Sequence, residues 1–327
     1  MRVNVIIATF NRAALLDECL ECLGRQRFVE GDEVLVVDNG STDSTPAVIA
    51  RHQRSFAAPV QHLEERHPGK SAALARALTV TDGDILAFTD DDVNVGEGWL
   101  DEVRGAMASG EAALIGGRVA PRWERRPPQW LQAGAEAGAG AGYGRLTAPL
   151  ALLDYGPEPL ELGPRTAIGA NLAVRHDVIR RVGGFAPHLG KLRGTLLSGE
   201  DHELCRRVQA AGFKTMYWPS AVVSHWVPAS RMRLRYVLRW FFWSGVTNAL
   251  LDEAAGQRTP ALFGVPRYLV RRFFVGIAAA PAFAAGGSVT AAIDRAIDAA
   301  FAAGYAAGCR GLVQRDLQPA VPAGERA

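Results

Sequence analysis

The sequence has few cysteines and almost no net charge, and each absence argues against a class of protein. Cys19 and Cys22 fall in a segment with helical spacing, while Cys205 and Cys309 have no histidine at the spacing of a zinc finger. Lys plus Arg number 36 against 34 for Asp plus Glu, and a net charge of +2 gives no reason to expect nucleic acid as a partner. We therefore expect buried thiols in a reducing cytoplasm.

The sequence also lacks a basic leader followed by a long apolar stretch, so residues 1–12 predict a first strand and not a signal peptide. Hydrophobic residues make up 48% of the chain and charged residues 21%, which is a globular composition that can form a sizeable core. With 327 residues we expect one large module or two smaller ones.

The first half of the chain alternates short apolar runs with segments of helical spacing. We predict strands at Val3–Thr9, Glu33–Val37, Val60–Leu63 and Ile85–Thr89, with helices at Ala13–Leu23, Asp43–Arg54 and Lys70–Thr79. This alternation predicts an α/β fold, with an open and mostly parallel sheet flanked by helices. Ligands bind beyond the carboxyl ends of such strands, where polar clusters follow at Thr9–Arg12, Asp38–Asp43 and Asp90–Asp92.

The second half is less regular. Pro121–Arg165 is rich in Pro, Gly and Ala and predicts a long loop or lid, after which strands and helices resume as far as Tyr217–Val227. Beyond Pro228 we expect a helical extension in which arginines alternate with aromatic residues, at 231–243 and again at 267–274. Residues 273–293 carry no charge, but Pro281 and a Gly-Gly pair interrupt them, so a membrane-spanning helix is not predicted. An amphipathic last helix is predicted over about Thr290–Leu312.

The most informative cluster is Asp90, Asp91 and Asp92, directly after a buried strand. Adjacent carboxylates repel one another, and a divalent cation such as Mg²⁺ or Mn²⁺ would relieve that repulsion. The alternative is a solvated acidic turn. Asp38 ends an earlier strand before an Asn-Gly turn, and there it is suited to contact a base or a ribose.

Two further positions could serve chemistry or structure alone. Glu200 and Asp201 open a predicted helix, where a carboxylate can cap the helix or act as a general base. His225 follows an apolar strand, where a lone histidine is either structural or a metal ligand.

Taken together, these blocks resemble the family 2 glycosyltransferases, which have the nucleotide-sugar-binding GT-A fold. The matching blocks, in the order of the family, are Ile6–Arg12, Val36–Asp43, Gly69–Leu74, Phe88–Val93, Gly169–Ala173, Gly183–Phe185 and Leu197–Asp201. The later stretch, including Trp130-Leu131 and His225 to Gly245, is similar to one bacterial subgroup. The resemblance implies a GT-A domain over residues 1–227, with a nucleotide-sugar-binding half (1–119) and a lid and acceptor half (120–227). Residues 228–327 are then a helical, basic and aromatic C-terminal region.

The resemblance also implies a role for each matching position. Ala8, Thr9, Phe10, Arg12 and Asp38 match the part that holds the base and ribose. Lys70, Asp90 and Asp91 match positions at the diphosphate and ribose. Asp92 and His225 match metal ligands, and Asp201 matches the general base that Glu200 flanks. Gly169, Ala170 and Asn171 match a block at the acceptor or behind it. Two departures from the family pattern are Ala8-Thr9 for the commoner Pro-Thr or Pro-Ala, and Ala75-Arg76 for Arg-Asn.

The implied activity is metal-dependent transfer of a sugar from a nucleoside diphosphate, such as UDP, to a hydroxyl acceptor with inversion at the anomeric carbon. Mn²⁺ or Mg²⁺ is the expected cofactor. The two arginine-aromatic stretches predict contact with anionic lipid at the inner face of the plasma membrane, which would suit a lipid-linked acceptor. The alternative is that they pack on the catalytic domain or join two copies in a homodimer.

Two other functions stay open at this point. A sugar nucleotidyltransferase also uses an open α/β sheet and metal-binding aspartates, but it would favour a glycine-rich loop in the first turn, which residues 8–12 lack. A non-catalytic, membrane-docked scaffold on the same fold would not need the paired acidic sites at Asp92 and Asp201.

Overall fold

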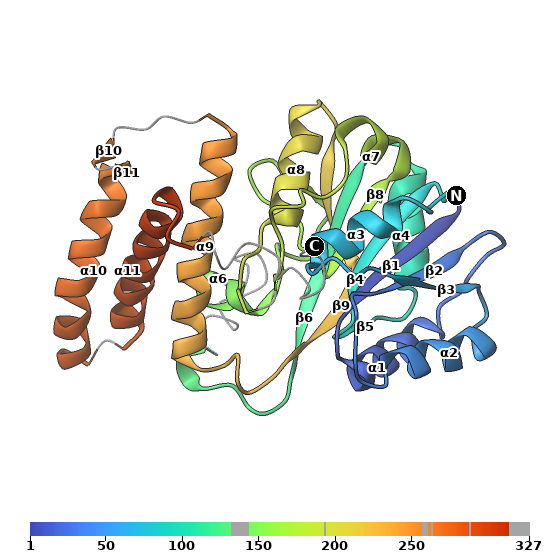
Figure 1. Cartoon of the computed structure of the whole chain (residues 1–327), viewed down its shortest axis with the longest axis horizontal. Coiled ribbons are helices and arrows are strands. Elements are labelled where there is room, and N and C mark those ends of the chain that lie inside the picture. The colour runs from blue at the N-terminus through green and yellow to red at the C-terminus, as the bar shows by residue number, and fades with distance from the viewer. Residues whose placement is uncertain (132–143, 193, 257–260, 263, 288, 314–327) are drawn as a thin grey trace, which may run out of the picture.

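The computed structural model describes residues 1–131, 144–192, 194–256, 261–262, 264–287 and 289–313. A sheet surrounded by helices occupies the first 227 residues, and a group of long helices follows it (Figure 1). The strands are β1 (Val3–Thr9), β2 (Glu33–Asp38), β3 (Val60–Glu64), β4 (Ile85–Asp90), β5 (Val93–Val95), β6 (Leu114–Trp123), β7 (Leu160–Glu161), β8 (Asn171–Arg175), β9 (Thr215–Val227), β10 (Ala261–Leu262) and β11 (Val265–Pro266). The helices are α1 (Ala13–Leu23), α2 (Thr45–Ser55), α3 (Lys70–Leu78), α4 (Trp99–Ala108), α6 (Gly144–Thr147), the short 3₁₀ helix η1 (Ala148–Leu150), α7 (His176–Val182), α8 (Glu200–Ala210), α9 (Leu234–Ala254), α10 (Arg267–Ala285) and α11 (Val289–Cys309).

The N-terminal half of the sheet is parallel, in the order β3-β2-β1-β4. The strands β1, β2 and β4 are almost continuous apolar runs, as expected of a sheet with helices on both faces, and residues 34–37 are buried, whereas the edge strand β3 is more polar. In the register of these strands Thr9 pairs with Asp38, and Ala8 pairs with Asp90. The carboxyl ends of β1, β2 and β4 therefore lie together, and the polar residues that follow them share one edge of the sheet.

The rest of the sheet is mixed. β8 pairs antiparallel with β4 and β6, and β6 pairs parallel with the 13-residue strand β9. β9 also pairs with the short edge strand β5, where Val93 lies opposite His225. Because β5 begins directly after the three aspartates, this pairing brings His225 beside Asp92.

The last three long helices pack in a layer beside the sheet, with α11 between α9 and α10 (Figure 1). Glycines allow α9 and α11 to approach closely. A Cβ atom at Gly304 would overlap the carbonyl oxygen of Phe242, and one at Gly245 would overlap that of Phe301. Across the described ranges, none of the helices combines the length and the apolar content needed to cross a bilayer.

Some boundaries differ from those predicted. The sequence predicts a helix from Asp43, but α2 begins at Thr45, because the Asp43 carboxylate accepts hydrogen bonds from the N–H groups of Ala13 and Thr45 and ties the starts of α1 and α2 together. The predicted last helix corresponds to α11, which ends at Cys309. Within the predicted lid, residues 132–143 lie outside the described residues, and the preceding part extends β6 to Trp123.

Candidate active site

Asp90, Asp91 and Asp92 lie at the end of β4 and form the centre of the site. They do not form a solvated turn, since Asp91 and Asp92 expose only 4% and 2% of their surface. Lys70 donates a hydrogen bond to Asp90 at 2.5 Å, and Arg12 donates to both Asp91 and Asp92 at 2.8 Å. These cations offset the mutual repulsion of three adjacent carboxylates, which could not otherwise stay buried.

The three carboxylates differ in their electrostatic surroundings. Burial alone would raise the pKa of Asp92, but His225 and two neighbouring arginines hold it well below its usual range. Burial would also raise the pKa of Asp90, but the charge of Lys70 lowers it. For Asp91, burial prevails and the pKa is raised. Asp90 and Asp92 are thus held in the ionised form that a metal ligand requires.

Asp90, Asp92 and His225 form a group that can hold such an ion. One ligand atom from each lies within 4.8 Å of the others. The Oδ1 atom of Asp92 makes no hydrogen bond to a described residue and lies 3.3 Å from Nε2 of His225, and the other ring nitrogen of His225, Nδ1, is buried without a hydrogen-bond partner among the described residues. Two carboxylates and one imidazole are a donor set that suits Mn²⁺ and can accept Mg²⁺, and atoms left without partners in a buried site are those a cation would satisfy. The residues present therefore fit a divalent cation.

The predicted nucleoside-binding residues lie along the same edge of the sheet. The Thr9 hydroxyl donates to Asp91 at 2.8 Å, and buried Asp38 accepts the N–H of Ser41, also at 2.8 Å. The loops after β1 and β2 are joined, because Asn11 donates its N–H to the Ser41 hydroxyl at 2.9 Å. Ala8, Thr9, Phe10 and Asp38 thus adjoin the acidic cluster, but they do not line the cavity described below.

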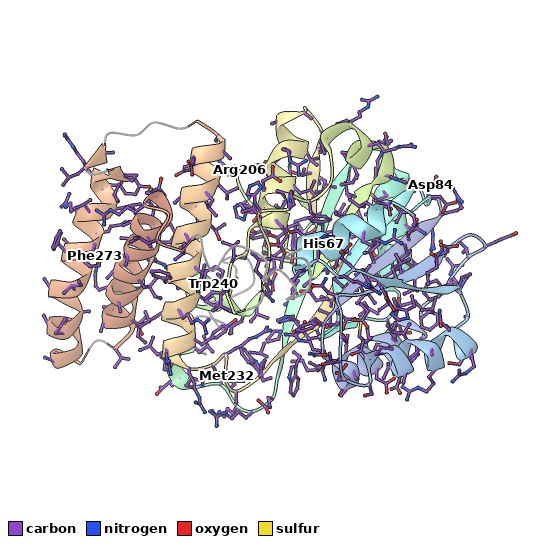
Figure 2. All side chains as sticks on the ribbon, in the orientation of Figure 1. His67, Asp84, Arg206, Met232, Trp240 and Phe273 are labelled. Carbon is purple, nitrogen blue, oxygen red and sulfur yellow. The ribbon has the colours of Figure 1, made fainter. Side chains whose placement is uncertain are left out.

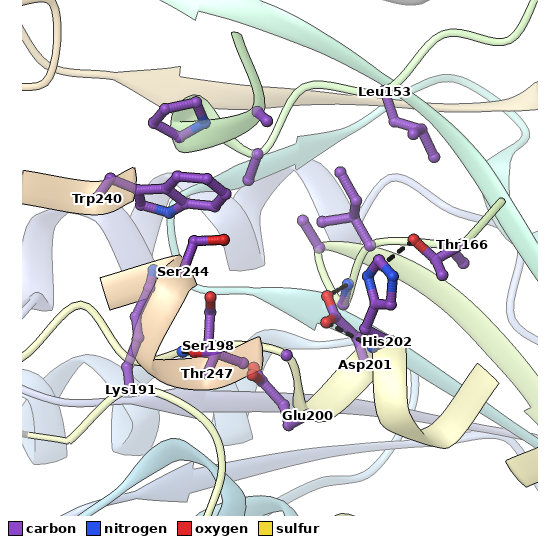
Figure 3. A pocket seen from close by; sticks show the side chains of 18 of the residues that line it. Leu153, Thr166, Lys191, Ser198, Glu200, Asp201, His202, Trp240, Ser244 and Thr247 are labelled. Carbon is purple, nitrogen blue, oxygen red and sulfur yellow. Dashed lines mark hydrogen bonds between the residues drawn. The ribbon is translucent and has the colours of Figure 1, made fainter. Parts of the chain in front are cut away.

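Asp201 lies across from the acidic cluster, at the start of α8. Its carboxylate is fixed by two backbone groups, since one oxygen accepts the N–H of Gly169 and the other accepts the N–H of His202, each at 2.8 Å (Figure 3). A Cβ atom at Gly169 would lie 3.4 Å from Lys70 Nζ and 3.6 Å from Asp201 Oδ2, so only a small residue fits between these two charges. Buried Glu200 lies 3.7 Å from Lys70, and burial together with the charge of Asp201 raises its pKa.

The other residues of the predicted acceptor block make hydrogen bonds within the protein itself. The Asn171 side chain accepts the indole N–H of Trp99 at 2.9 Å and donates to the carbonyl oxygens of Arg118 and Ala221. The carbonyl oxygen of Ala170 accepts the hydroxyl of Thr89 at 3.0 Å. Asn171 therefore fastens β8 to its neighbours from within the core, while Gly169 and Ala170 line the cavity.

A cavity of about 480 Å³ connects these groups, a volume within the usual range of small-molecule sites. Lys70, Asp90 and Glu200 line one end of it, next to Asp201. The other wall is one face of α9, with residues 236, 240, 244 and 248 at a spacing of four. Figure 3 shows Trp240 and Ser244 of this face. Trp240 lies on the side of α9 that faces the sheet (Figure 2).

Several residues of the site are not predicted from the sequence. For Arg231 the sequence leaves open a lipid surface or packing on the catalytic domain; Arg231 lies 3.5 Å from Asp92 with 12% of its side chain exposed, in agreement with the second alternative. Lys191, Trp240 and His202 also line the cavity, and His202 lies within hydrogen-bond distance of the Thr166 hydroxyl, at 3.1 Å. The spacing of four along α9 is visible in the sequence, but it does not tell which partner that helix face meets.

Comparison with known proteins points to one family, the glycosyltransferases of family 2. The sequence profile described as Glycosyl transferase family 2 matches residues 4–179, more than half of the chain. The chain is 23% identical over 266 residues to a glucosyl-dolichyl phosphate glucuronosyltransferase of Haloferax volcanii, covering 77% of this chain and 78% of that one. It is 26% identical over 263 residues to the succinoglycan biosynthesis protein ExoM of Rhizobium meliloti, covering 79% and 78%.

A solved structure extends the likeness to the fold. The mannosyltransferase PcManGT from Pyrobaculum calidifontis, in complex with GDP-Man and Mn²⁺, superposes with a TM-score of 0.54 at 20% identity, covering 96% of this chain and 75% of that one. At this identity the likeness concerns the fold, and it confirms the predicted nucleotide-sugar-binding architecture with its C-terminal helical extension. The chain belongs to glycosyl transferase family 2 and is a glycosyltransferase of the GT-A fold.

Proposed function

We propose that the protein is a metal-dependent, inverting glycosyltransferase that moves a sugar from a nucleoside diphosphate, with UDP the favoured carrier, to a hydroxyl group. The observation that carries this proposal is the single cavity shared by Lys70, Asp90 and Asp201, with Asp92 and His225 beside it. This arrangement supports the proposal, because cationic groups and a fixed carboxylate adjoin one space that a leaving diphosphate and an attacking hydroxyl could share.

The acidic cluster is the donor side of the proposed site. A Mn²⁺ or Mg²⁺ ion held by Asp92 and His225, with Asp90 in reach, would neutralise charge on the departing diphosphate. Lys70 adds a second positive charge beside the diphosphate. Burial alone would lower the pKa of Lys70, but the charges of Asp90 and Glu200 raise it, so the amino group stays protonated. Ala8, Thr9, Phe10, Arg12 and Asp38 are assigned to the base and ribose, and Asp91 holds the hydroxyl of Thr9 at that side.

Asp201 is the proposed general base. Its two backbone hydrogen bonds hold the carboxylate toward the cavity, so it can take the proton of the acceptor hydroxyl. The acceptor oxygen forms a bond to the anomeric carbon while the bond from that carbon to the diphosphate breaks. The proton goes to Asp201, and the electron pair leaves with the nucleoside diphosphate. One displacement of this kind inverts the configuration, and an α-linked donor yields a β-linked product.

The α9 wall is the proposed acceptor side. Trp240 offers a flat apolar ring, while Ser244 and Asn248 on the same face offer hydroxyl and amide groups. A sugar ring has apolar C–H faces and a rim of hydroxyls, so this wall suits a carbohydrate better than a bare lipid chain. The name of the Haloferax volcanii relative supports a lipid-linked sugar as acceptor. We place the protein in the synthesis of cell-surface polysaccharide or glycolipid, in the cytoplasm at the inner face of the plasma membrane.

The test is a donor screen that reads nucleoside diphosphate release in the presence of Mn²⁺ or Mg²⁺. A glycosyltransferase of the proposed kind releases the nucleoside diphosphate, and NMR of the product shows an inverted linkage. Release of pyrophosphate would indicate the alternative, a sugar nucleotidyltransferase. No turnover with any donor, together with binding to membranes, would favour the non-catalytic scaffold.

A further inference from the structure

The outer face of α10 is an exposed apolar surface whose positive charge is confined to one end. Tyr268, Phe274 and Ile277 expose 56%, 66% and 54% of their surface. Positions 267, 271, 274, 278, 282 and 285 follow one another at intervals of three or four residues, so they form one stripe, and all of them are exposed. Tyr268 and Arg272 flank this stripe on one side and Ile277 on the other, and they are exposed too. The opposite face packs on α11, with Leu269 fully buried. This outer side points away from the rest of the protein (Figure 2).

The charge along α10 has a definite pattern. Arg267, Arg271 and Arg272 stand in its first two turns, are exposed, and form no ion pair with any described residue. The rest of the helix, from Phe273 to Ala285, has no charged residue. No acidic residue occurs anywhere in the sequence from residue 254 to residue 293. The surface therefore presents cations and apolar side chains and nothing to neutralise them.

A second copy of the chain does not complement this face. In a symmetric dimer each helix meets the same face of its partner. A parallel pair would bring the arginines of both copies together, and an antiparallel pair would place them against the apolar end of the partner helix. Neither arrangement gives Arg267, Arg271 or Arg272 a carboxylate from the α10 helix of the partner, because that helix has none, so the two paired faces would not neutralise each other.

An anionic bilayer complements both parts. Acidic headgroups provide the negative charge, and the boundary with the acyl chains accepts aromatic and aliphatic side chains. We propose that the outer face of α10 is the surface by which this protein docks on membranes that contain acidic phospholipid. The inference deepens the membrane contact of the proposed function, but it does not rest on the reaction. Of the two predicted stretches it keeps 267–274, which lies in α10, and leaves out 231–243, whose Arg231 faces the active site.

The experiment is flotation of the full-length protein with vesicles of phosphatidylcholine alone or mixed with phosphatidylserine, without any sugar donor. We expect binding to rise with the phosphatidylserine fraction and to weaken as salt is added. Each arginine near anionic lipid contributes about fivefold in partitioning, so Arg267→Gln/Arg271→Gln/Arg272→Gln should weaken binding about 25-fold through the two arginines on the stripe, and up to about 100-fold when Arg272 on its flank also reaches the lipid. Phe274→Ser/Ile277→Ser should weaken it about tenfold or more by removing buried apolar area.

Matched controls carry the same changes on the catalytic domain. Arg25→Gln/Arg54→Gln/Arg180→Gln removes the same charge from exposed positions away from α10, and Val29→Ser/Val80→Ser removes exposed apolar side chains. Both should bind vesicles like the parent, and circular dichroism checks that every variant is folded. If the control and α10 variants lose binding equally, or if none loses it, the docking face is wrong. If the α10 changes instead alter the oligomeric state in light scattering and leave flotation unchanged, the face joins two copies and the proposal is overturned. Failure of the donor screen would leave the flotation result unaffected.

Discussion

The sharpest test of the proposed mechanism is Asp201→Asn. Both carboxylate oxygens of Asp201 accept backbone N–H groups, from Gly169 and His202. An asparagine has one acceptor oxygen, and its amide nitrogen would face the other N–H group donor to donor. Leaving a buried N–H group without a partner costs about 1–3 kcal/mol of folding stability, and the cost here should lie at the low end of this range, because the hydrogen bond from His202 is exposed and water can reach that group. We therefore expect a lowered melting temperature in addition to any effect on the rate.

The kinetic effect should be larger than the effect on stability. Loss of a general base lowers transfer by about 10²- to 10⁴-fold. Asp201 makes no hydrogen bond to the acidic cluster in the described residues, so donor affinity should change little. The assay measures nucleoside diphosphate release at saturating donor, at a temperature where the variant is fully folded, and donor affinity is measured separately by calorimetry.

His202 provides the matched comparison, because it lines the same cavity next to Asp201 and an imidazole is the commonest general base. His202→Asn should retain most of the rate if Asp201 takes the proton. A large loss in His202→Asn with activity retained in Asp201→Asn would move the base to the histidine. An equal fall of rate and donor affinity in Asp201→Asn would make Asp201 a binding residue and refute the assignment.

Three further predictions concern the metal, the cation beside it and the C-terminal helices. EDTA should abolish turnover, Mn²⁺ or Mg²⁺ should restore it, and Asp92→Asn should lose most activity while staying folded, whereas full activity in EDTA would contradict the metal site. Arg231→Gln should lower nucleoside diphosphate release by about tenfold or more, because it removes one member of a buried ion pair with Asp92, and vesicle flotation should not change. Unchanged release together with weaker flotation would show that Arg231 contacts lipid. Gly304→Leu should lower the melting temperature, because the added side chain overlaps the carbonyl oxygen of Phe242 and overpacking costs about 1–3 kcal/mol; an unchanged melting curve would show that α9 and α11 can separate freely.

Much of the fold is predictable because its signal is local. The strands β1, β2 and β4 are short apolar runs that end in polar residues, and a parallel sheet with helices on both faces produces that pattern. The edge where Thr9, Asp38 and Asp90 meet follows from the topology alone, since the carboxyl ends of parallel strands lie together. Helix starts are harder to predict, and Asp43 is an example. Its carboxylate accepts one N–H group from the start of α1 and one from the start of α2, so it does not act as the N-cap of a single helix.

The part of the site that is not predictable depends on contacts between distant segments. Arg231 alternates with aromatic residues in the sequence, and the same alternation occurs at lipid surfaces and in buried interfaces. What distinguishes a buried interface from a lipid surface here is the contact between Arg231 and Asp92. Asp92 is far away in the sequence, and no local pattern encodes that contact. The same holds for Lys191 and Trp240, which line the cavity from a loop and a helix that the sequence does not place beside the sheet.

The position of Arg231 also bears on how the chain divides into parts. The sequence predicts a catalytic domain that ends at Val227 and a separate helical region after it. Yet one hydrophobic core joins the two, since Leu131 and Leu150 from the first part pack with Val237 and Phe241 from the second. The cavity is likewise lined from both sides of that boundary. Because the same contacts that bury this core also hold the α9 wall against the acidic cluster, the helical region sets the shape of the cavity, which is the proposed acceptor site. We therefore expect movement of α9 to change both acceptor binding and the surroundings of Asp92.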